Sequence, residues 1–166
     1  MELPREGEGA ALVCRTSSPE ETEKVGALLG SLAAAGDVIC LYGPLGAGKT
    51  VFARGLGRGL GVDTRIASPT FTLIHEHRGR LPFYHADAYR LEGAGDFRAV
   101  GGEEYLYGDG VTVIEWADRI AQALPEARLD VFLEGSDSER TLAFIPRGER
   151  YRRLVEEMGH LVRSGS

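Results

Sequence analysis

Apolar and polar positions alternate along the chain in blocks that predict strands and helices in turn. The apolar runs at 38–42 and 111–114 predict two buried strands. Between residues 18 and 36, a Ser-Pro-Glu-Glu start is followed by apolar positions at helical spacing, which predicts a capped helix. This alternation predicts an α/β fold of three layers, with a mostly parallel sheet and helices on both faces.

The remaining blocks predict shorter or less regular elements. Further strands are predicted at 10–16, 71–77, 81–87, 129–133 and 141–145, and further helices at 51–60 and 117–124. Residues 88–110 are rich in glycine, acidic and aromatic residues, and predict short helices and loops. We expect residues 1–166 to form one domain, with a core at about 10–146 and a C-terminal helix at about 147–163.

Composition narrows the classes of function. The formal net charge of −6 argues against broad, nonspecific binding to nucleic acid, which needs a basic surface. The first residues lack a basic region followed by an apolar stretch, and no apolar run is long enough to cross a bilayer. We therefore expect a cytoplasmic protein that does not engage a membrane, and we expect Cys14 and Cys40 to be buried free thiols.

The segment Gly43–Thr50 matches the pattern G-x-x-x-x-G-K-S/T in full. A predicted buried strand precedes it and a predicted helix follows it, as a phosphate-binding loop (P-loop) requires. Glycines let the backbone N–H groups approach a triphosphate, and the helix N-terminus adds its dipole. Lys49 supplies a positive charge for the β- and γ-phosphates, and Thr50 offers a hydroxyl to Mg²⁺. The motif predicts binding of ATP or ADP with Mg²⁺.

Two alternatives for the nucleotide are disfavoured by the same residues. A dinucleotide-binding site would need G-x-G-x-x-G after a strand, and none is present. The guanine signature of GTPases begins with Asn-Lys, and the chain has no asparagine. Adenine is therefore the expected base, although no residue that reads it can be identified.

Two acidic residues, Asp87 and Glu115, end predicted strands and are the candidates for completing the metal site. Aspartate is the usual partner of Mg²⁺, whereas the longer glutamate is better suited to orient an attacking water. We therefore assign Asp87 to the metal and Glu115 to the nucleophilic water, and keep Glu115 as a candidate metal ligand too. The reverse assignment stays open.

Four segments together resemble one protein family. They are the P-loop at 43–50, Ser68-Pro69-Thr70-Phe71-Thr72-Leu73, His85-Ala86-Asp87-Ala88-Tyr89-Arg90-Leu91 and Ile114-Glu115-Trp116. Their order and spacing resemble the TsaE (YjeE) family, the ATPases of tRNA threonylcarbamoyladenosine biosynthesis. The resemblance implies an ATPase that acts with TsaB and TsaD, which attach a threonylcarbamoyl group to the adenosine beside the tRNA anticodon. It implies contact with tRNA mainly through that complex; alone, we expect a monomer or weak dimer.

The resemblance also implies roles for particular residues. Lys49 and Thr50 would bind phosphate and Mg²⁺, and Thr70, in a switch-like loop, would lie near the γ-phosphate or metal. Asp87 resembles the family's metal-site aspartate and Glu115 its second functional acid. The family often has an acid where this chain has Pro44. The expected nucleotide contacts are Gly43, Leu45, Gly46, Ala47, Gly48, Lys49, Thr50 and Val51.

Plainer interpretations remain for several side chains. Thr70 could simply begin a strand, and Trp116 could belong to the core, to a partner interface or to the nucleotide site. Zinc binding is not expected at His75, His77 and His85, because no full set of zinc ligands with recognisable spacing accompanies them. We expect these histidines to occupy exposed strand positions. A small-molecule or nucleotide kinase, and a nucleotide-dependent scaffold without turnover, remain the rival functions.

Overall fold

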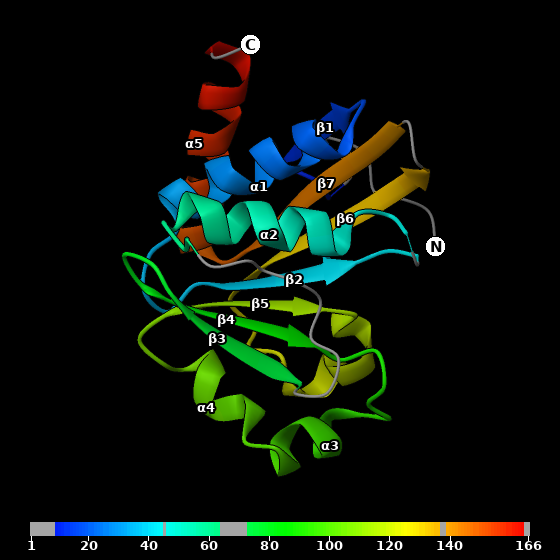
Figure 1. The fold of residues 1–166 in the computed structure, drawn as a ribbon, viewed down its shortest axis with the longest axis vertical. Coiled ribbons are helices and arrows are strands. Elements are labelled where there is room, and N and C mark those ends of the chain that lie inside the picture. The colour runs from blue at the N-terminus through cyan, green and yellow to red at the C-terminus, as the bar shows by residue number, and fades with distance from the viewer. Residues whose placement is uncertain (1–8, 45, 64–72, 137–138, 165–166) are drawn as a thin grey trace.

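The computed structural model describes residues 9–44, 46–63, 73–136 and 139–164 (Figure 1). The strands are β1 (Leu12–Thr16), β2 (Val38–Tyr42), β3 (Ile74–Arg78), β4 (Pro82–Asp87), β5 (Val111–Glu115), β6 (Arg128–Ser136) and β7 (Glu139–Arg147). The helices are α1 (Pro19–Leu32), α2 (Lys49–Gly59), α3 (Ala94–Ala99), α4 (Gly102–Leu106), the 3-10 helix η1 (Ala117–Ala123) and α5 (Glu149–Ser164).

All seven strands join in one sheet in the order β1-β7-β6-β2-β5-β4-β3. The central strand β2 pairs in parallel with β6 on one side and β5 on the other, and β4 pairs in parallel with β5. Only β7 and β3 run against the common direction, because they form antiparallel pairs with β6 and β4. The mixed, largely parallel sheet confirms the predicted α/β fold class.

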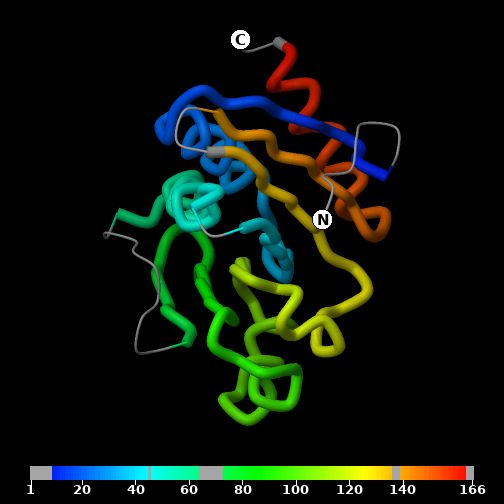
Figure 2. The backbone as a smooth tube through the Cα atoms, turned by 90° about the vertical axis from the view of Figure 1, so that its right-hand side faces the viewer, coloured from blue at the N-terminus to red at the C-terminus, as the bar shows by residue number. Residues whose placement is uncertain are grey.

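Helices cover both faces of the sheet, as the sequence predicted (Figures 1 and 2). One hydrophobic core lies between the sheet and α1, α2 and α5, and includes Leu41 and Leu56. The second core lies under α3, α4 and η1, and includes Cys40 and Ile114. Alternate residues of β2 enter opposite cores because side chains of a strand point to opposite faces. The first strand, β1, and the last helix, α5, lie side by side in both views.

The bounds of several elements differ from the predicted ones. Strands β6 and β7 extend beyond the apolar segments, so that their ladder reaches the pair of Ser136 with Glu139. Strand β3 begins at Ile74, and residues 71–72 of the predicted strand lie outside the described residues. The segment after β5 is a 3-10 helix with a non-helical residue, Ile120. Among the described residues, no helix is long and apolar enough to cross a membrane.

Helices α1 and α2 approach each other closely because both present glycine at the contact. A Cβ atom added at any of four glycines would overlap a backbone carbonyl oxygen of the opposite helix. Such contacts allow only one register between the two helices. Since α2 begins at the P-loop, this packing fixes the helix that follows the loop. The four residues are Gly26 and Gly30 on α1, and Gly55 and Gly59 on α2.

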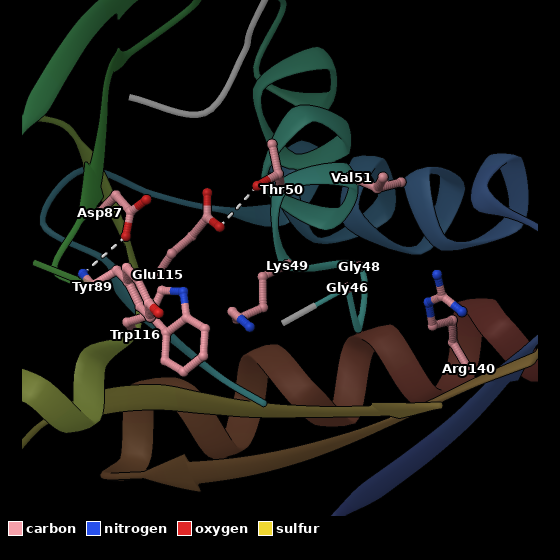
Figure 3. Close-up of a pocket in the computed structure, with 10 residues that line it drawn as sticks. All are labelled: Gly46, Gly48, Lys49, Thr50, Val51, Asp87, Tyr89, Glu115, Trp116 and Arg140. Atoms are coloured by element: carbon pink, nitrogen blue, oxygen red, sulfur yellow. Dashed lines mark hydrogen bonds between the residues drawn. The ribbon is translucent and has the colours of Figure 1, made fainter. Parts of the chain in front are cut away.

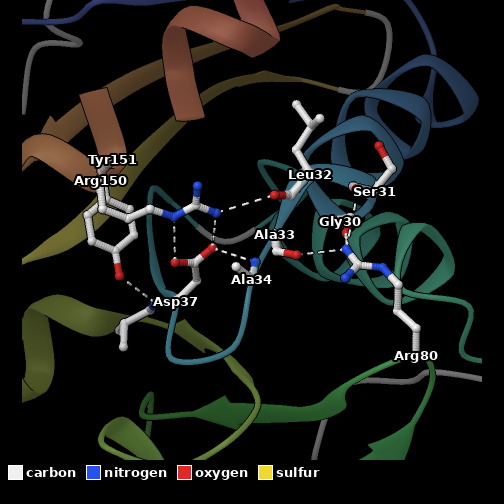
Figure 4. Close-up of polar contacts among 10 residues, drawn as sticks. Gly30, Ser31, Leu32, Ala33, Ala34, Asp37, Arg80, Arg150 and Tyr151 are labelled. Atoms are coloured by element: carbon white, nitrogen blue, oxygen red, sulfur yellow. Dashed lines mark hydrogen bonds and ion pairs between the residues drawn. The ribbon is translucent and has the colours of Figure 1, made fainter. Parts of the chain in front are cut away.

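Both ends of α1 are closed by side chains. At the start, Ser18 Oγ accepts a hydrogen bond of 3.1 Å from the backbone N–H of Glu21, which confirms the predicted N-cap. At the other end, Arg80, from the turn between β3 and β4, donates to the carbonyl oxygens of Gly30 and Ala33 at 2.7 Å each (Figure 4). The helix ends at Leu32, before the predicted stop, and this arginine satisfies carbonyl groups that the helix end leaves unpaired.

The amino end of β2 is tied to α5. The buried carboxylate of Asp37 accepts hydrogen bonds of 3.1 and 2.7 Å from Arg150 (Figure 4). The hydroxyl group of Tyr151 accepts a bond of 2.9 Å from the backbone N–H of Val38. Arg150 and Tyr151 therefore join the start of α5 to the amino end of β2. The thiols of Cys14 and Cys40 lie buried and no disulfide joins them.

Candidate nucleotide-binding site

The P-loop joins the central strand β2 to helix α2, as predicted. Three of its glycines adopt positive φ angles, 146° at Gly43, 80° at Gly46 and 100° at Gly48. Residues with a side chain rarely adopt this region, so these positions need glycine. The resulting curve is open at the carboxyl end of β2. Leu45, an expected nucleotide contact, lies outside the described residues.

Lys49 lies inside this curve. Its ammonium group donates to the carbonyl oxygens of Gly43 and Pro44, at 2.6 and 2.8 Å, and lies 4.0 Å from the centre of the Trp116 ring. Burial lowers the pKa of Lys49, and the negative charges of Glu115, Asp118 and Asp87 oppose that change. Lys49 is thus a buried cation at the mouth of the loop.

The two candidate acids meet at the same edge of the sheet. Asp87 ends β4 and Glu115 ends β5, and the two residues are register partners in adjacent parallel strands. They are not equivalent, however. Glu115 Oε1 accepts a hydrogen bond of 2.9 Å from the hydroxyl group of Thr50, whereas Asp87 Oδ1 accepts one of 3.0 Å from the backbone N–H of Tyr89. The glutamate is therefore the acid joined directly to the P-loop.

A buried histidine holds the other oxygen of that glutamate. His85 Nε2 lies 2.5 Å from Glu115 Oε2, and the His85 side chain has no exposed surface. The expectation that the histidines of this region are exposed was therefore wrong for His85. Its second ring nitrogen, Nδ1, is buried and has no hydrogen-bond partner within the described residues. Thr50, Glu115 and His85 thus form a continuous contact from the P-loop into the sheet.

The aromatic side chains beside the acids cover the lysine. Trp116 has φ 57° and ψ 43°, a left-handed conformation that bulky residues rarely adopt. Its ring packs on Tyr89, with ring centres 4.8 Å apart. Of the roles left open for Trp116, the structure supports a position beside the loop, since the ring contacts Lys49. Tyr89 remains 45% exposed, at the rim.

These residues line one continuous pocket (Figure 3). Its acidic end holds Asp87 and Glu115, and its opposite end holds Arg140 of β7, which no sequence pattern had indicated. Thr70 and the segment around it lie outside the described residues. The lining residues are Gly46, Gly48, Lys49, Thr50, Val51, Asp87, Tyr89, Glu115, Trp116 and Arg140.

The arrangement combines an anion site with an oxygen-rich edge. The curved loop and the start of α2 point backbone N–H groups and Lys49 at one region, which suits phosphate groups. The hydroxyl group of Thr50 and two carboxylates face it, which suits a hard cation. Among the described residues, no three His, Cys, Asp or Glu side chains gather closely enough to hold a metal alone.

A glycine loop of this sequence between a central parallel strand and a helix defines the class of P-loop proteins. A family model described as "Threonylcarbamoyl adenosine biosynthesis protein TsaE" matches residues 16–142, and the chain belongs to this TsaE family.

Relatives and a solved structure agree with that assignment. The chain is 44% identical over 146 residues to tRNA threonylcarbamoyladenosine biosynthesis protein TsaE of Bacillus subtilis, covering 87% of this chain and 91% of the relative. It is 46% identical over 120 residues to the protein of the same name from Treponema pallidum, covering 72% and 89%. The crystal structure of Bacillus subtilis YdiB superposes with a TM-score of 0.78 at 41% identity, covering 90% of this chain and 94% of that one.

Proposed function

We propose that this protein is a Mg²⁺-dependent ATPase of the TsaE type. It hydrolyses ATP to ADP and phosphate, and thereby supports a TsaB–TsaD complex that installs threonylcarbamoyl on the adenosine beside the tRNA anticodon. The observation that carries the ATPase proposal is the contact of Thr50 with Glu115, directly beside the buried Lys49 in the P-loop. The pathway rests on the TsaE family and on the names of its relatives.

The loop would hold the triphosphate by its backbone. N–H groups between Gly43 and Val51 would donate to the phosphate oxygens, and Leu45 belongs to this set by its place in the motif. Lys49 would exchange the carbonyl oxygens of Gly43 and Pro44 for the β- and γ-phosphates. Because its ammonium group is already buried, little desolvation would accompany that exchange.

The oxygen atoms around Thr50 fit a bound Mg²⁺ ion. The direct contact between Thr50 and Glu115 favours the reverse of the initial assignment, so we place both in the metal shell. Asp87, which is the register partner of Glu115 on the adjacent strand, would then orient the attacking water. It could also reach the metal through a second, bridging water molecule. When bound, the ion would neutralise charge on the β- and γ-phosphates. Thr70 keeps its proposed role as a sensor of the γ-phosphate.

Hydrolysis would be an in-line attack of water on the γ-phosphate. Asp87 would hold that water, while Lys49 and the loop N–H groups stabilise the charge that develops on the phosphoryl oxygens. His85 would keep the Glu115 carboxylate in place through its bond to Oε2. In the complex, TsaB and TsaD would respond to the change from bound ATP to bound ADP. Contact with tRNA would be made through these two partners.

The test compares two variants, one that removes the charge of Lys49 in the site and one that removes the charge of Lys24 elsewhere. The chain has only two lysines, and Lys24 lies exposed on α1. Phosphate release from ATP would be measured for wild type, Lys49→Met and Lys24→Met, alone and with TsaB, TsaD and tRNA. We expect TsaB and TsaD to stimulate phosphate release by the wild type. We expect Lys49→Met to abolish release and Lys24→Met to leave it unchanged. Threonylcarbamoyl incorporation into tRNA should fall with it.

Other outcomes would indicate the rival functions. Labelled γ-phosphate on an acceptor molecule rather than in solution would identify a kinase. ATP binding without any phosphate release, even with both partners and tRNA present, would identify a scaffold without turnover.

A further inference from the structure

Arg140 lines the pocket from a strand that the P-loop motif does not include. It lies on β7, opposite Thr16 of β1 and Gly135 of β6. Its guanidinium packs against the loop, so that a Cβ at Gly48 would lie 3.2 Å from Arg140 Nε. Figure 3 shows Arg140 on the far side of Gly46 and Gly48 from Glu115 and Asp87.

The guanidinium of Arg140 differs in its partners from those of three other arginines on β6, β7 and α5. Arg128 and Arg147 pair with Asp130, and Arg150 pairs with Asp37. Within the described residues, the side chain of Arg140 makes no hydrogen bond or ion pair, and one of its terminal nitrogens is buried without a partner. A buried donor of a charged group is costly to leave unsatisfied, so an anion that reached it would bind strongly.

The direction of the bound nucleotide follows from the proposed metal position. In the proposed function, Thr50 and Glu115 would hold the cation, so the γ-phosphate would lie toward the acidic end of the pocket. The phosphate chain would then run past the loop, with its α-phosphate toward Val51 and Arg140, which also line the pocket.

We infer that Arg140 is a nucleotide-binding residue that donates to an oxygen of the α-phosphate. The inference rests on the proposed function, and it deepens that proposal because neither the motif nor the strand-end acids supply a charged side chain at the nucleoside end. A guanidinium fixed on a strand would recognise nucleoside di- and triphosphates in preference to inorganic phosphate, which has no α-phosphate group.

The test uses the two diastereomers of ADPαS, in which sulfur replaces one or the other α-oxygen. Binding is measured by calorimetry in EDTA, so that a metal ion's preference for one diastereomer does not contribute. Wild type should bind one diastereomer several-fold more tightly, since sulfur is a weaker acceptor than oxygen. Arg140→Gln should bind ADP about tenfold more weakly and should bind the two diastereomers with nearly equal affinity. Arg140→Lys should recover affinity without the preference, because a lysine lacks the fixed fork.

Arg15→Gln is the matched control. Arg15 is exposed on β1, one strand away, and its loss changes the net charge equally. It should bind ADP and both diastereomers as wild type does. The inference is wrong if Arg140→Gln binds ADP normally, or if it loses affinity while keeping the wild-type preference. If wild type itself fails to bind ADP, the proposed nucleotide site is wrong rather than the role of Arg140 alone.

Discussion

Two buried carboxylates flank the central strand β2, and their surroundings differ. Asp130, on β6, pairs with Cys40, and its carboxylate is bonded to Arg128, Arg147 and the hydroxyl group of Tyr42. Glu115, on β5, is the register partner of Leu41 and is contacted by Thr50 and His85. Their exposed fractions, 1% and 3%, are nearly the same. Burial alone therefore does not distinguish a structural acid from a functional one.

The number of cations around each acid does distinguish them. Two guanidiniums neutralise Asp130, so this carboxylate has no remaining demand for positive charge. Glu115 has a hydroxyl group and an imidazole as its contacts and faces the pocket that contains Lys49. We expect substitutions at Asp130 to change stability and substitutions at Glu115 to change catalysis.

The largest effect should follow Glu115→Gln, which keeps the shape of the side chain and removes its charge. ATP hydrolysis should fall at least about 100-fold, because the proposed metal shell loses a carboxylate. The free energy of unfolding should change by less than about 1 kcal/mol, since an amide can still accept from Thr50. Phosphate release and urea unfolding measure the two quantities. Normal hydrolysis by this variant would remove Glu115 from the site.

Asp130→Asn should show the opposite behaviour. Two arginines would lose a buried partner, and the free energy of unfolding should fall by about 3 kcal/mol. Hydrolysis per folded molecule should stay within about twofold of wild type, because Asp130 does not line the pocket. The control is Asp109→Asn, at an exposed position, with an expected change below about 1 kcal/mol. Equal destabilisation by both variants would argue against this role of Asp130.

His85→Gln tests whether the histidine acts through Glu115. The concentration of Mg²⁺ that gives half-maximal hydrolysis should rise about tenfold, because the carboxylate loses the group that orients it. Saturating Mg²⁺ should restore most of the rate. His75→Gln, at the register partner of His85 on β3, should leave the Mg²⁺ requirement unchanged. A rate loss in His85→Gln that no Mg²⁺ concentration restores would instead indicate damage to the sheet.

Alkaline pH should lower the stability of the folded protein through Cys40, the register partner of Asp130. Burial, and then the charge of Asp130, raises the pKa of the Cys40 thiol above its ordinary value of 9.0. The folded protein keeps this proton where the unfolded chain loses it, so the contribution of Cys40 to stability is complete below pH 9.0 and declines above it. The expected slope is about 1.4 kcal/mol per pH unit. Urea unfolding of wild type and Cys40→Ala above that pH should show a shallower decline in the variant, and equal slopes would exclude this contribution.

Much of the fold could be predicted from local patterns. The apolar runs at 38–42 and 111–114 became the adjacent strands β2 and β5, and the segment after Ser18 became a capped helix. The ends of β6 and β7 could not be predicted because their polar residues continue the ladder through backbone hydrogen bonds, which leave no apolar signal.

The parts of the site that could be predicted are those marked by a local pattern, either a motif or the end of an apolar strand. The P-loop is a motif, and the strand-end rule brought Asp87 and Glu115 to one edge of the sheet. Which acid contacts Thr50 depends on side-chain geometry across strands, so the sequence left two assignments open. The positions of His85 and Arg140 follow from strand register between distant segments, and no local pattern records that register.

The glycine contacts between α1 and α2 have a consequence for signalling. Since backbone meets backbone there, the two helices have one packing arrangement, and we expect the P-loop helix to stay fixed if nucleotide is exchanged. A response to the γ-phosphate would then pass through the opposite wall of the site, where the rings of Tyr89 and Trp116 pack with their centres 4.8 Å apart. We expect a partner protein that senses the nucleotide state to bind at the rim formed by Tyr89 and Trp116.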